Sequence, residues 1–379
     1  MRIAQVPPLH ESVPPRLYGG TERIVSFLTE ELVRRGHEVT LFASGDSATS
    51  AKLVSSRKVA LRLDTNPLSS PTAAHLAMLH EVRRRHEEFD VIHVHLSHFI
   101  HFPIFEEIAA KVVTTPHGRL DYADLPRAYA CWPDFPMISI SKHQRRPLPG
   151  ANWIANIYHG LPLELYLPVE PKTSGEPYLA FLGRMSRAKR PDRAIEIARG
   201  AGMKLKMAAK IEGDDAVFYR EKVEPQVDGK AIEFVGEVDE EQKAAFLSGA
   251  AALLFPIDWP EPFGLVVIEA MAFGVPVIAW NEAAMPEIID EGVTGFIVDS
   301  IGAAVEAARK ARELDRSRIR QVFETRFSAA RMVSDYEAVY AAIGEGKSRQ
   351  PHSSSAVMGE SVFSEQSWMI NGGRLSSGG

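Results

Sequence analysis

The sequence predicts an α/β protein with two domains, each built on a parallel β-sheet of the Rossmann type. Three observations lead to this prediction. Short apolar segments of strand length alternate with longer amphipathic segments along most of the 379 residues. Glycine-containing loops follow several of these strands, as in βαβ units. A proline-rich stretch without helical or strand periodicity, residues 161–177, separates two such series and is typical of an interdomain linker.

Composition narrows the class of protein. The chain is 45% hydrophobic and 24% charged, which is typical of globular proteins and sufficient for two cores. A net charge of −6 argues against a nucleic-acid-binding protein. The single cysteine, Cys131, excludes an internal disulfide framework and fits a reducing compartment. Residues 1–15 lack the apolar run of a signal peptide, and no stretch approaches the ~20 apolar residues of a membrane helix. We therefore expect a cytoplasmic protein.

The first βαβ unit opens the chain. A short strand at residues 2–6 leads into a long loop that ends in Gly19 and Gly20. Thr21 is then expected to cap a helix, and the next strand covers residues 38–43. The loop therefore lies at the carboxyl edge of the sheet, where the glycine pair would let backbone N–H groups approach a phosphate or a sugar. Ordinary turns use such pairs as well.

Histidines gather at the end of the next predicted strand, residues 90–96. His93 and His95 point to the same face of that strand, and His98 and His101 follow closely. A metal site is one interpretation of this group. No carboxylate or cysteine accompanies the histidines, so we favour a polar strand end that faces the cleft between the domains.

A further histidine follows the strand in residues 111–118. His117 stands at the end of that strand and is followed by Gly118, a position well suited to contact a ligand. Strands predicted within residues 137–141 and 152–160 complete the first half.

The second half begins with an anion-binding pattern. A strand at residues 178–182 turns at Gly183, and the next helix starts near Pro191, which is favourable in a first helical turn. Arg184 and Lys189 lie in the loop between them. Two cations beside a helix N-terminus, at the carboxyl end of a strand, suit a diphosphate, although both could also be ordinary surface charges.

The remaining predicted elements repeat the strand–helix alternation. In chain order they are a strand at 205–210, a helix after 214, a strand at 231–236, a helix at 239–247, a strand at 251–255 and a helical region at 301–345. The tail is rich in Ser and Gly and is expected to be disordered. The predicted division is a domain at 1–165, a domain at 166–344 whose last helix can pack back on the first, and a tail at 345–379.

The stretch from Phe255 to Ala279 is central to the predicted function. It predicts a strand end, a proline-rich loop and a helix from Gly264, so this helix points its N-terminus at the carboxyl edge of the sheet and favours a phosphate there. Glu261 lies in the loop and Glu269 lies inside the helix. The helical neighbours of Glu269 are apolar, which is costly unless its carboxylate is hydrogen-bonded, and vicinal sugar hydroxyls would serve.

At this point the sequence resembles the retaining glycosyltransferases of family 4. The resemblance covers roughly residues 1–344 and rests on EPFGLVVIE and FLGRMSRAK, supported by LYGGTE, TPHG and AMPEIIDEGVTGFIVD. It implies the GT-B architecture, two facing Rossmann-like domains with a cleft between them. It also implies that a sugar is transferred from a nucleotide diphosphate donor with retention of anomeric configuration and without a bound metal. No Asp-x-Asp triplet is present, which agrees with metal independence.

The resemblance assigns roles to particular residues. Arg184 and Lys189 would hold the diphosphate, Glu261 would bind sugar hydroxyls and Glu269 the ribose hydroxyls. His117 would contact the transferred sugar. The implied catalytic residues are His117, Glu261, Arg184 and Lys189, and the implied donor-binding residues are Gly19, Gly20, Gly183, Phe263, Gly264, Leu265 and Glu269.

Three departures from the family pattern leave the donor open. Many members carry a glycine turn where this chain has Ala209 and Lys210, many have Lys-Gly at 189–190, and the usual Asn-Gly before the linker is His-Gly at 159–160. The expected acceptor site lies on the N-terminal domain, near the histidine-rich segment and Tyr18, Arg119, Tyr122 and Trp132.

The resulting prediction is a retaining enzyme that moves a hexose from a UDP- or GDP-sugar to a hydroxyl of a small polar, saccharide or pterin-like heteroaromatic acceptor. No cofactor, no metal and no nucleic-acid partner are expected, and membrane contact would be peripheral at most, since charges in the first half nearly balance. The sequence does not indicate an oligomeric state. A nucleotide-sugar epimerase or hydrolase on the same fold, and a non-catalytic sugar-nucleotide-binding protein, are the alternatives.

Overall fold

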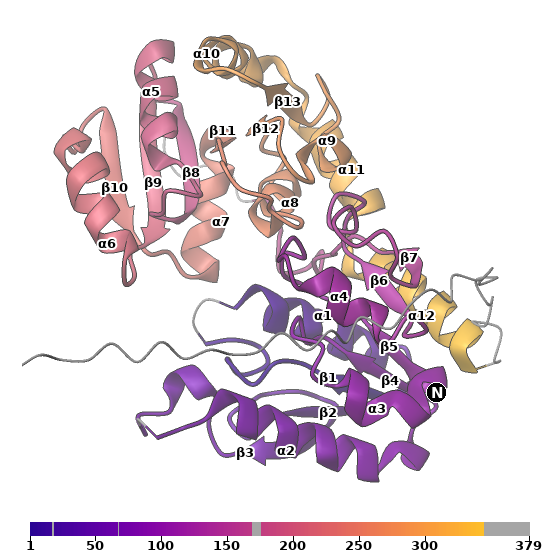
Figure 1. Ribbon diagram of the computed structural model, residues 1–379. Helices are drawn as coiled ribbons and strands as arrows, with labels where there is room; N and C mark the ends of the chain where they lie inside the picture. The colour runs from indigo at the N-terminus through magenta and orange to yellow at the C-terminus, as the bar shows by residue number, and fades with distance from the viewer. Residues whose placement is uncertain (17–18, 67, 169–175, 345–379) are drawn as a thin grey trace, which may run out of the picture. The chain divides into compact units, whose positions relative to one another are not determined.

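The computed structural model of the chain describes residues 1–16, 19–66, 68–168 and 176–344 (Figure 1). The predicted tail at 345–379 and the acceptor candidate Tyr18 lie outside these described residues.

The first half forms a seven-stranded sheet in which all neighbouring strands are parallel, in the order β3-β2-β1-β4-β5-β6-β7. Strand β1 lies between β2 and β4, with Ile3 opposite Val39 on one side and Val91 on the other. The strands are β1 (Arg2–Val6), β2 (Glu38–Ser44), β3 (Lys52–Arg57), β4 (Val91–Val94), β5 (Val112–Thr114), β6 (Met137–Ser139) and β7 (Trp153–Asn156).

The second half forms a six-stranded parallel sheet in the order β10-β9-β8-β11-β12-β13. Its central strands read as almost continuous apolar runs, as in AAALLF of β11, because helices cover both faces of a parallel sheet. The strands are β8 (Tyr178–Arg184), β9 (Lys204–Lys210), β10 (Ile232–Gly236), β11 (Ala250–Phe255), β12 (Val277–Trp280) and β13 (Gly295–Val298).

Helices connect the strands in βα units. In the first half they are α1 (Gly20–Arg34), α2 (Pro71–Arg84), α3 (Phe102–Phe105) and α4 (Leu125–Ala130). Those of the second half are α5 (Pro191–Ala201), α6 (Asp215–Phe218), α7 (Glu240–Ser248), α8 (Leu265–Ala272), α9 (Met285–Ile288), α10 (Ile301–Lys310), α11 (Arg316–Arg326) and α12 (Ala329–Gly344).

Strand order locates the functional edge of each sheet. Each order reverses direction at one point, between β1 and β4 in the first sheet and between β8 and β11 in the second. Ligands of open α/β sheets bind outside the carboxyl ends of the strands at such a reversal. The predicted fold of two Rossmann-like parallel sheets is confirmed, whereas the predicted domain boundaries stay a prediction.

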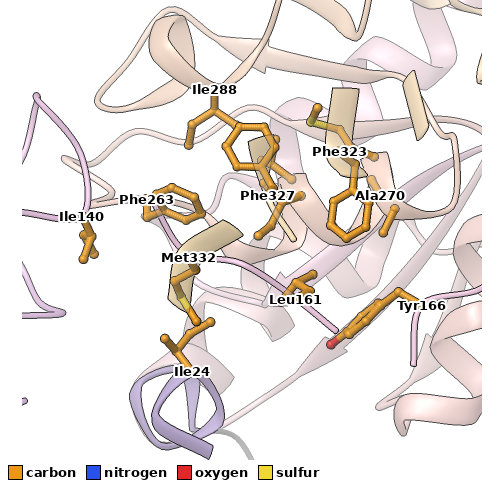
Figure 2. Packing of buried hydrophobic residues seen from close by; sticks show 14 of the residues in the cluster. Ile24, Ile140, Leu161, Tyr166, Phe263, Ala270, Ile288, Phe323, Phe327 and Met332 are labelled. Carbon is orange, nitrogen blue, oxygen red and sulfur yellow. The ribbon is translucent and has the colours of Figure 1, made fainter. Parts of the chain in front are cut away.

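The last described helix contacts the beginning of the chain. Helix α12 packs against α1 and β4, and the largest apolar cluster contains Ile24 of α1 together with Met332 of α12. Figure 2 shows these two side chains beside each other, and it shows Phe263 near Phe327, whose ring centroids lie 6.3 Å apart. This shared core joins the loop before α8 to the C-terminal helices.

One local prediction was wrong, one strand was missed, and the helical region predicted at 301–345 is confirmed but divided. Helix α1 begins at Gly20, so Thr21 lies inside its first turn, and the N-cap Gly19 has no side chain to accept a hydrogen bond. Strand β3 was not predicted, because KLVSSR lacks a clear apolar alternation. The helical region at 301–345 divides into separate helices, since the carboxylate of Asp315 accepts from the N–H groups of Ser317 and Arg318 and starts α11 anew.

Candidate active site

A cavity of about 680 Å³ lies where the carboxyl ends of the two sheets meet. Its volume is within the range of small-molecule and cofactor pockets. It contains every predicted catalytic and donor-binding residue except Arg184. These residues are Gly19, Gly20, His117, Gly183, Lys189, Glu261, Phe263, Gly264, Leu265 and Glu269.

Glu269 is the buried carboxylate of this cavity, with 4% of its surface exposed. Its Oε1 lies 2.9 Å from Lys243 Nζ and 3.2 Å from an Nη1 of Arg23, and the hydroxyl of Tyr166 lies 3.5 Å away. Burial by itself raises the pKa of Glu269, but the charges of Lys243 and Arg23 outweigh it and leave the pKa below its usual value. The carboxylate is therefore ionised at neutral pH and can accept hydrogen bonds from hydroxyl groups.

Lys189 and Glu261 form a second charged pair at the wall of the cavity. Lys189 Nζ donates to Glu261 Oε2, which also accepts from the indole N–H of Trp259 at 2.7 Å. The ammonium group lies 5.4 Å from the ring centroid of Phe255 and 5.7 Å from that of Trp259. Aromatic faces and a carboxylate thus hold this cation at the position where the predicted anion site needs it.

Helix α8 directs its N-terminus into the same cavity, because Gly264, its N-cap, and Leu265, its first residue, line the wall. Gly264 has φ +92°, and a Cβ there would approach Met285 Cε to 3.0 Å, so both backbone conformation and space favour glycine. The first N–H groups of a helix have no intrahelical acceptor and carry partial positive charge. They suit a phosphate or a sugar oxygen.

The glycine pair approaches this helix from the first half. A Cβ on Gly19 would lie 2.9 Å from Pro15 Cβ and 3.0 Å from a carboxylate oxygen of Glu22, so no side chain fits. A Cβ on Gly20 would lie 3.5 Å from Leu265 Cδ1. The β1–α1 loop therefore passes close to the helix α8 N-terminus.

His117 lines the cavity and lies against a second histidine, His159. Their ring centroids are 5.1 Å apart with an interplanar angle of 11°. Burial lowers the pKa of His117 to about 3, so the ring is neutral at pH 7.

Arg184 and the three described acceptor candidates do not line the cavity. Arg184 is 43% exposed and lies 3.9 Å from Asp215, outside the set of residues that lines the cavity. Arg119 pairs with Asp121 and stacks over Tyr122 and Trp259. Tyr122 is exposed, and Trp132 packs against an apolar cluster of the first half. The acceptor roles of Arg119, Tyr122 and Trp132 stay a prediction.

The histidine-rich segment does not form a metal site in the described part of the chain, where no group of three or more His, Cys, Asp or Glu side chains could hold an ion. Both ring nitrogens of His93 are engaged, at 2.7 Å from the hydroxyl of Tyr340 and 2.8 Å from that of Thr115. His101 Nε2 lies 2.8 Å from the hydroxyl of Thr114, whereas His101 Nδ1 has no hydrogen-bond partner in the described structure. His93, His95 and His101 are buried and none of them lines the cavity between the sheets, so the predicted polar strand end does not face it.

Sequence reasoning missed several residues that line or support the cavity. Lys243 and Arg23 sit on predicted helices, but their pairing with Glu269 joins elements 26 and 246 residues apart in sequence, which no local pattern indicates. Lys210 also lines the cavity. Lys210 and His159 both carried a signal, since they replace a glycine turn and an asparagine that are usual in the resembled family.

Arg190 occupies the position where that family commonly has glycine, and it adopts φ +54°, in the left-handed region. Its guanidinium pairs with Asp192 and Asp258. Arg190→Gly and Arg190→Ala both remove these pairs, but only alanine keeps the unfavourable conformation. We expect the glycine variant to be more stable than the alanine variant by about 1 kcal/mol in chemical denaturation. Equal stabilities would show that this conformation carries no strain.

Comparison with known families agrees with this geometry. A profile of the family described as "Glycosyltransferase Family 4" matches residues 18–158, and one described as "Glycosyl transferases group 1" matches residues 164–324. The chain belongs to the GT-B glycosyltransferases of the family 4 type. The predicted resemblance is thereby confirmed, and the protein is a glycosyltransferase.

Individual relatives of this glycosyltransferase are distant but cover most of it. The N-acetyl-alpha-D-glucosaminyl L-malate synthase of Bacillus anthracis is 25% identical over 85% of this chain and 93% of its own length. The D-inositol 3-phosphate glycosyltransferase of Mycolicibacterium smegmatis is 24% identical over 88% of each chain. The structure of Anabaena HepE in complex with UDP and glucose has a TM-score of 0.69 at 17% identity, over 90% of this chain and 100% of that one, which shows the fold alone.

None of the described helices is long and apolar enough to cross a membrane.

Proposed function

We propose that this glycosyltransferase moves a hexose from a UDP- or GDP-sugar to a hydroxyl group of a small polar acceptor, with retention of anomeric configuration. The observation that carries the proposal is the convergence of Lys189, Glu261, Glu269 and the N-terminus of α8 on one cavity that also contains His117. The HepE complex with UDP and glucose supports a nucleotide-sugar donor. The single cysteine fits action in the cytoplasm.

The cavity suits a donor that extends from Glu269 to His117. The ionised carboxylate of Glu269 would accept hydrogen bonds from the two ribose hydroxyls. Lys189 and the amides at the start of α8 would bind the diphosphate, and Glu261 would bind hydroxyls of the hexose. Arg184 joins them in this proposal if its exposed side chain turns from Asp215 toward the phosphates.

Transfer with retention requires the acceptor to attack on the face from which the diphosphate leaves. Such a reaction needs stabilisation of the departing phosphate charge and of a positively charged anomeric carbon. Lys189 and the α8 amides would supply the first, and Glu261 the second. A leaving-group oxygen can itself accept the proton of the acceptor hydroxyl, so no protein nucleophile is required.

The acceptor would occupy a neighbouring cavity of about 240 Å³ in the first half. This cavity shares Gly19, Gly20 and Thr21 with the donor cavity, so the two ligands would meet at the start of α1. Its wall includes the polar side chains of His10, Glu22, Arg62, His75, Ser97 and His98. Such a lining suits a small hydroxylated acceptor, such as a saccharide or a pterin-like ring.

The three alternative functions predict different outcomes. An epimerase would change the sugar nucleotide without an acceptor, a hydrolase would release free hexose, and a binding protein would form no product. The decisive assay combines UDP- and GDP-hexoses with a panel of polyols, saccharides and pterins and detects products by mass spectrometry. A hexosyl adduct whose NMR coupling constant matches the donor anomer supports the proposal. An inverted linkage, or turnover that is independent of acceptor, would contradict it.

Metal independence provides a separate prediction. Because Lys189 and the helix N-terminus offset the diphosphate charge, EDTA at saturating concentration should leave transfer within about twofold of the untreated rate. Loss of activity with EDTA and its recovery with Mg²⁺ or Mn²⁺ would show that a metal ion is needed.

A further inference from the structure

A continuous chain of buried hydrogen bonds runs from His117 into the first half of the protein. His117 Nε2 lies 2.9 Å from His95 Nδ1, and His95 Nε2 lies 2.7 Å from Gln5 Oε1. Gln5 Nε2 then donates to the hydroxyl of Tyr340 at 3.3 Å, and this hydroxyl lies 2.7 Å from His93 Nδ1. The chain thus connects strands β1 and β4 to helix α12 behind the wall of the donor cavity.

Burial keeps the imidazole rings in this chain of hydrogen bonds neutral. Gln5, His93 and Tyr340 are fully buried and His95 is 1% exposed. Burial lowers the pKa of His93 and of His95 well below the usual histidine value, as it does for His117. A neutral imidazole has one N–H donor and one acceptor nitrogen, so the partner of one nitrogen determines the role of the other.

The direction of donation is set by the orientation of the Gln5 amide, which is assigned with Oε1 toward His95 and Nε2 toward Tyr340. Gln5 Oε1 can only accept, so His95 Nε2 carries the hydrogen and His95 Nδ1 accepts. The hydrogen between the two rings must then lie on His117 Nε2. His117 Nδ1 consequently has a lone pair. It is buried and has no hydrogen-bond partner in the described structure.

The other end of the chain is consistent with this direction. Tyr340 accepts from the Gln5 amide and is free to donate to His93 Nδ1. His93 Nε2 then carries the hydrogen and donates to Thr115 Oγ1 at 2.8 Å. Every member of the chain donates and accepts in an allowed way, so the arrangement is satisfied everywhere except at His117 Nδ1.

We propose that His95, Gln5 and Tyr340 are positioning residues that fix His117 as the neutral Nε2–H tautomer, so that its Nδ1 accepts a hydrogen bond from a hydroxyl group of a ligand in the cavity. A buried acceptor without a partner costs about 1–3 kcal/mol, and a ligand hydroxyl relieves that cost. The stacked ring of His159 keeps the His117 ring in its plane. That this hydroxyl belongs to the donor hexose or to the acceptor rests on the proposed function.

The tautomer has a mechanistic consequence. A neutral His117 whose only hydrogen is donated to His95 cannot protonate the leaving diphosphate. Stabilisation of that leaving group then depends on the cations and amides of the second half, and His117 acts by orienting a hydroxyl.

The direct test is an NMR measurement on the ligand-free, full-length protein labelled with 15N-histidine. Two-bond 1H–15N correlations distinguish the two neutral tautomers and the charged ring. We expect His117, His95 and His93 all to be Nε2–H tautomers at pH 7. A charged His117, or one that carries its hydrogen on Nδ1, overturns the proposal. Because no substrate is added, this result is independent of whether the proposed transfer occurs.

Variants of His95 separate positioning from simple packing. Glutamine can donate to Gln5 and accept from His117, whereas leucine can do neither. His95→Leu should remove the single tautomer of His117 and lower kcat about tenfold, and His95→Gln should restore both. His101→Gln alters a buried histidine outside the chain and should change neither. If His95→Leu does not fold, Gln5→Leu removes the same acceptor and should also abolish the single tautomer. An unchanged His117 spectrum in a folded His95→Leu or Gln5→Leu variant overturns the proposal.

Discussion

Lys189→Ala should reduce glycosyl transfer about 10²–10³-fold while leaving the fold intact. The ammonium group faces the donor cavity and would neutralise charge that develops on the departing diphosphate, and loss of one such preorganised contact typically costs this much. The free energy of unfolding should change little in this variant, because Glu261, the partner of Lys189, keeps the hydrogen bond from Trp259. Once the assay of UDP- and GDP-hexoses with the acceptor panel has identified the substrates, steady-state kinetics with them would measure the effect.

Lys204→Ala is the matched control for this experiment. Lys204 also pairs with a glutamate of the second sheet, Glu233 at 3.1 Å, but it does not line the cavity. Its variant should retain normal transfer. Near-normal turnover in Lys189→Ala, with the same thermal stability as Lys204→Ala, would refute the role of Lys189.

Glu269→Gln should have the second large effect, on both stability and donor affinity. Glu269 is the buried partner of Lys243 and Arg23, and removing one member of a buried ion pair costs about 3 kcal/mol. The free energy of unfolding should therefore fall by about that amount. Because the folded-state pKa of Glu269 is lowered, its stabilisation is present at neutral pH and is lost as the pH falls through that pKa. The glutamine variant should lack this part of the acid sensitivity.

Kinetics should distinguish Glu269 from Glu261. A contact to the nucleotide ribose is present in ground and transition states alike, so Glu269→Gln should mainly raise the KM for the donor. Glu261 would contact the reacting hexose, where interactions strengthen as the anomeric carbon becomes positive, so Glu261→Gln should mainly lower kcat. The reverse pattern would mean that the two roles are exchanged.

Glu233→Gln provides the control for the stability measurement. Glu233 also has two lysine partners, Lys204 and Lys206, but about a third of its side chain is exposed. Its loss should change the free energy of unfolding by less than about 1 kcal/mol. A similar loss in both glutamine variants would show that burial of Glu269 is not the cause.

The sequence predicted the fold and the donor side of the site because both depend on local patterns. Apolar runs of strand length followed by glycine or proline placed Gly183, Lys189 and Gly264 in the connections that lead from a strand to the next helix. Parallel topology then brings these connections to one edge of the sheet. The burial of Glu269 followed from its apolar helical neighbours. These inferences need only residues within one or two turns of each other.

Long-range pairing could not be predicted in the same way. The cations around Glu269 come from α1 and α7, and the hydrogen-bonded chain behind His117 includes a tyrosine 223 positions later in the sequence, Tyr340. Such contacts depend on how two sheets and a returning C-terminal helix pack. Thr21 illustrates a different failure, because capping preference at the start of α1 yields to the close approach of Gly19 to Glu22.

The central claim is that the cavity between the two sheets binds a nucleotide diphosphate-sugar through Glu269. Isothermal titration calorimetry of the wild type and of Glu269→Gln against UDP- and GDP-hexoses, in EDTA, tests it most directly. We expect at least one donor to bind the wild type, with affinity at least tenfold weaker in the variant under conditions where both proteins are folded. Failure of every donor to bind the wild type, or equal affinities in the two proteins, would contradict the claim.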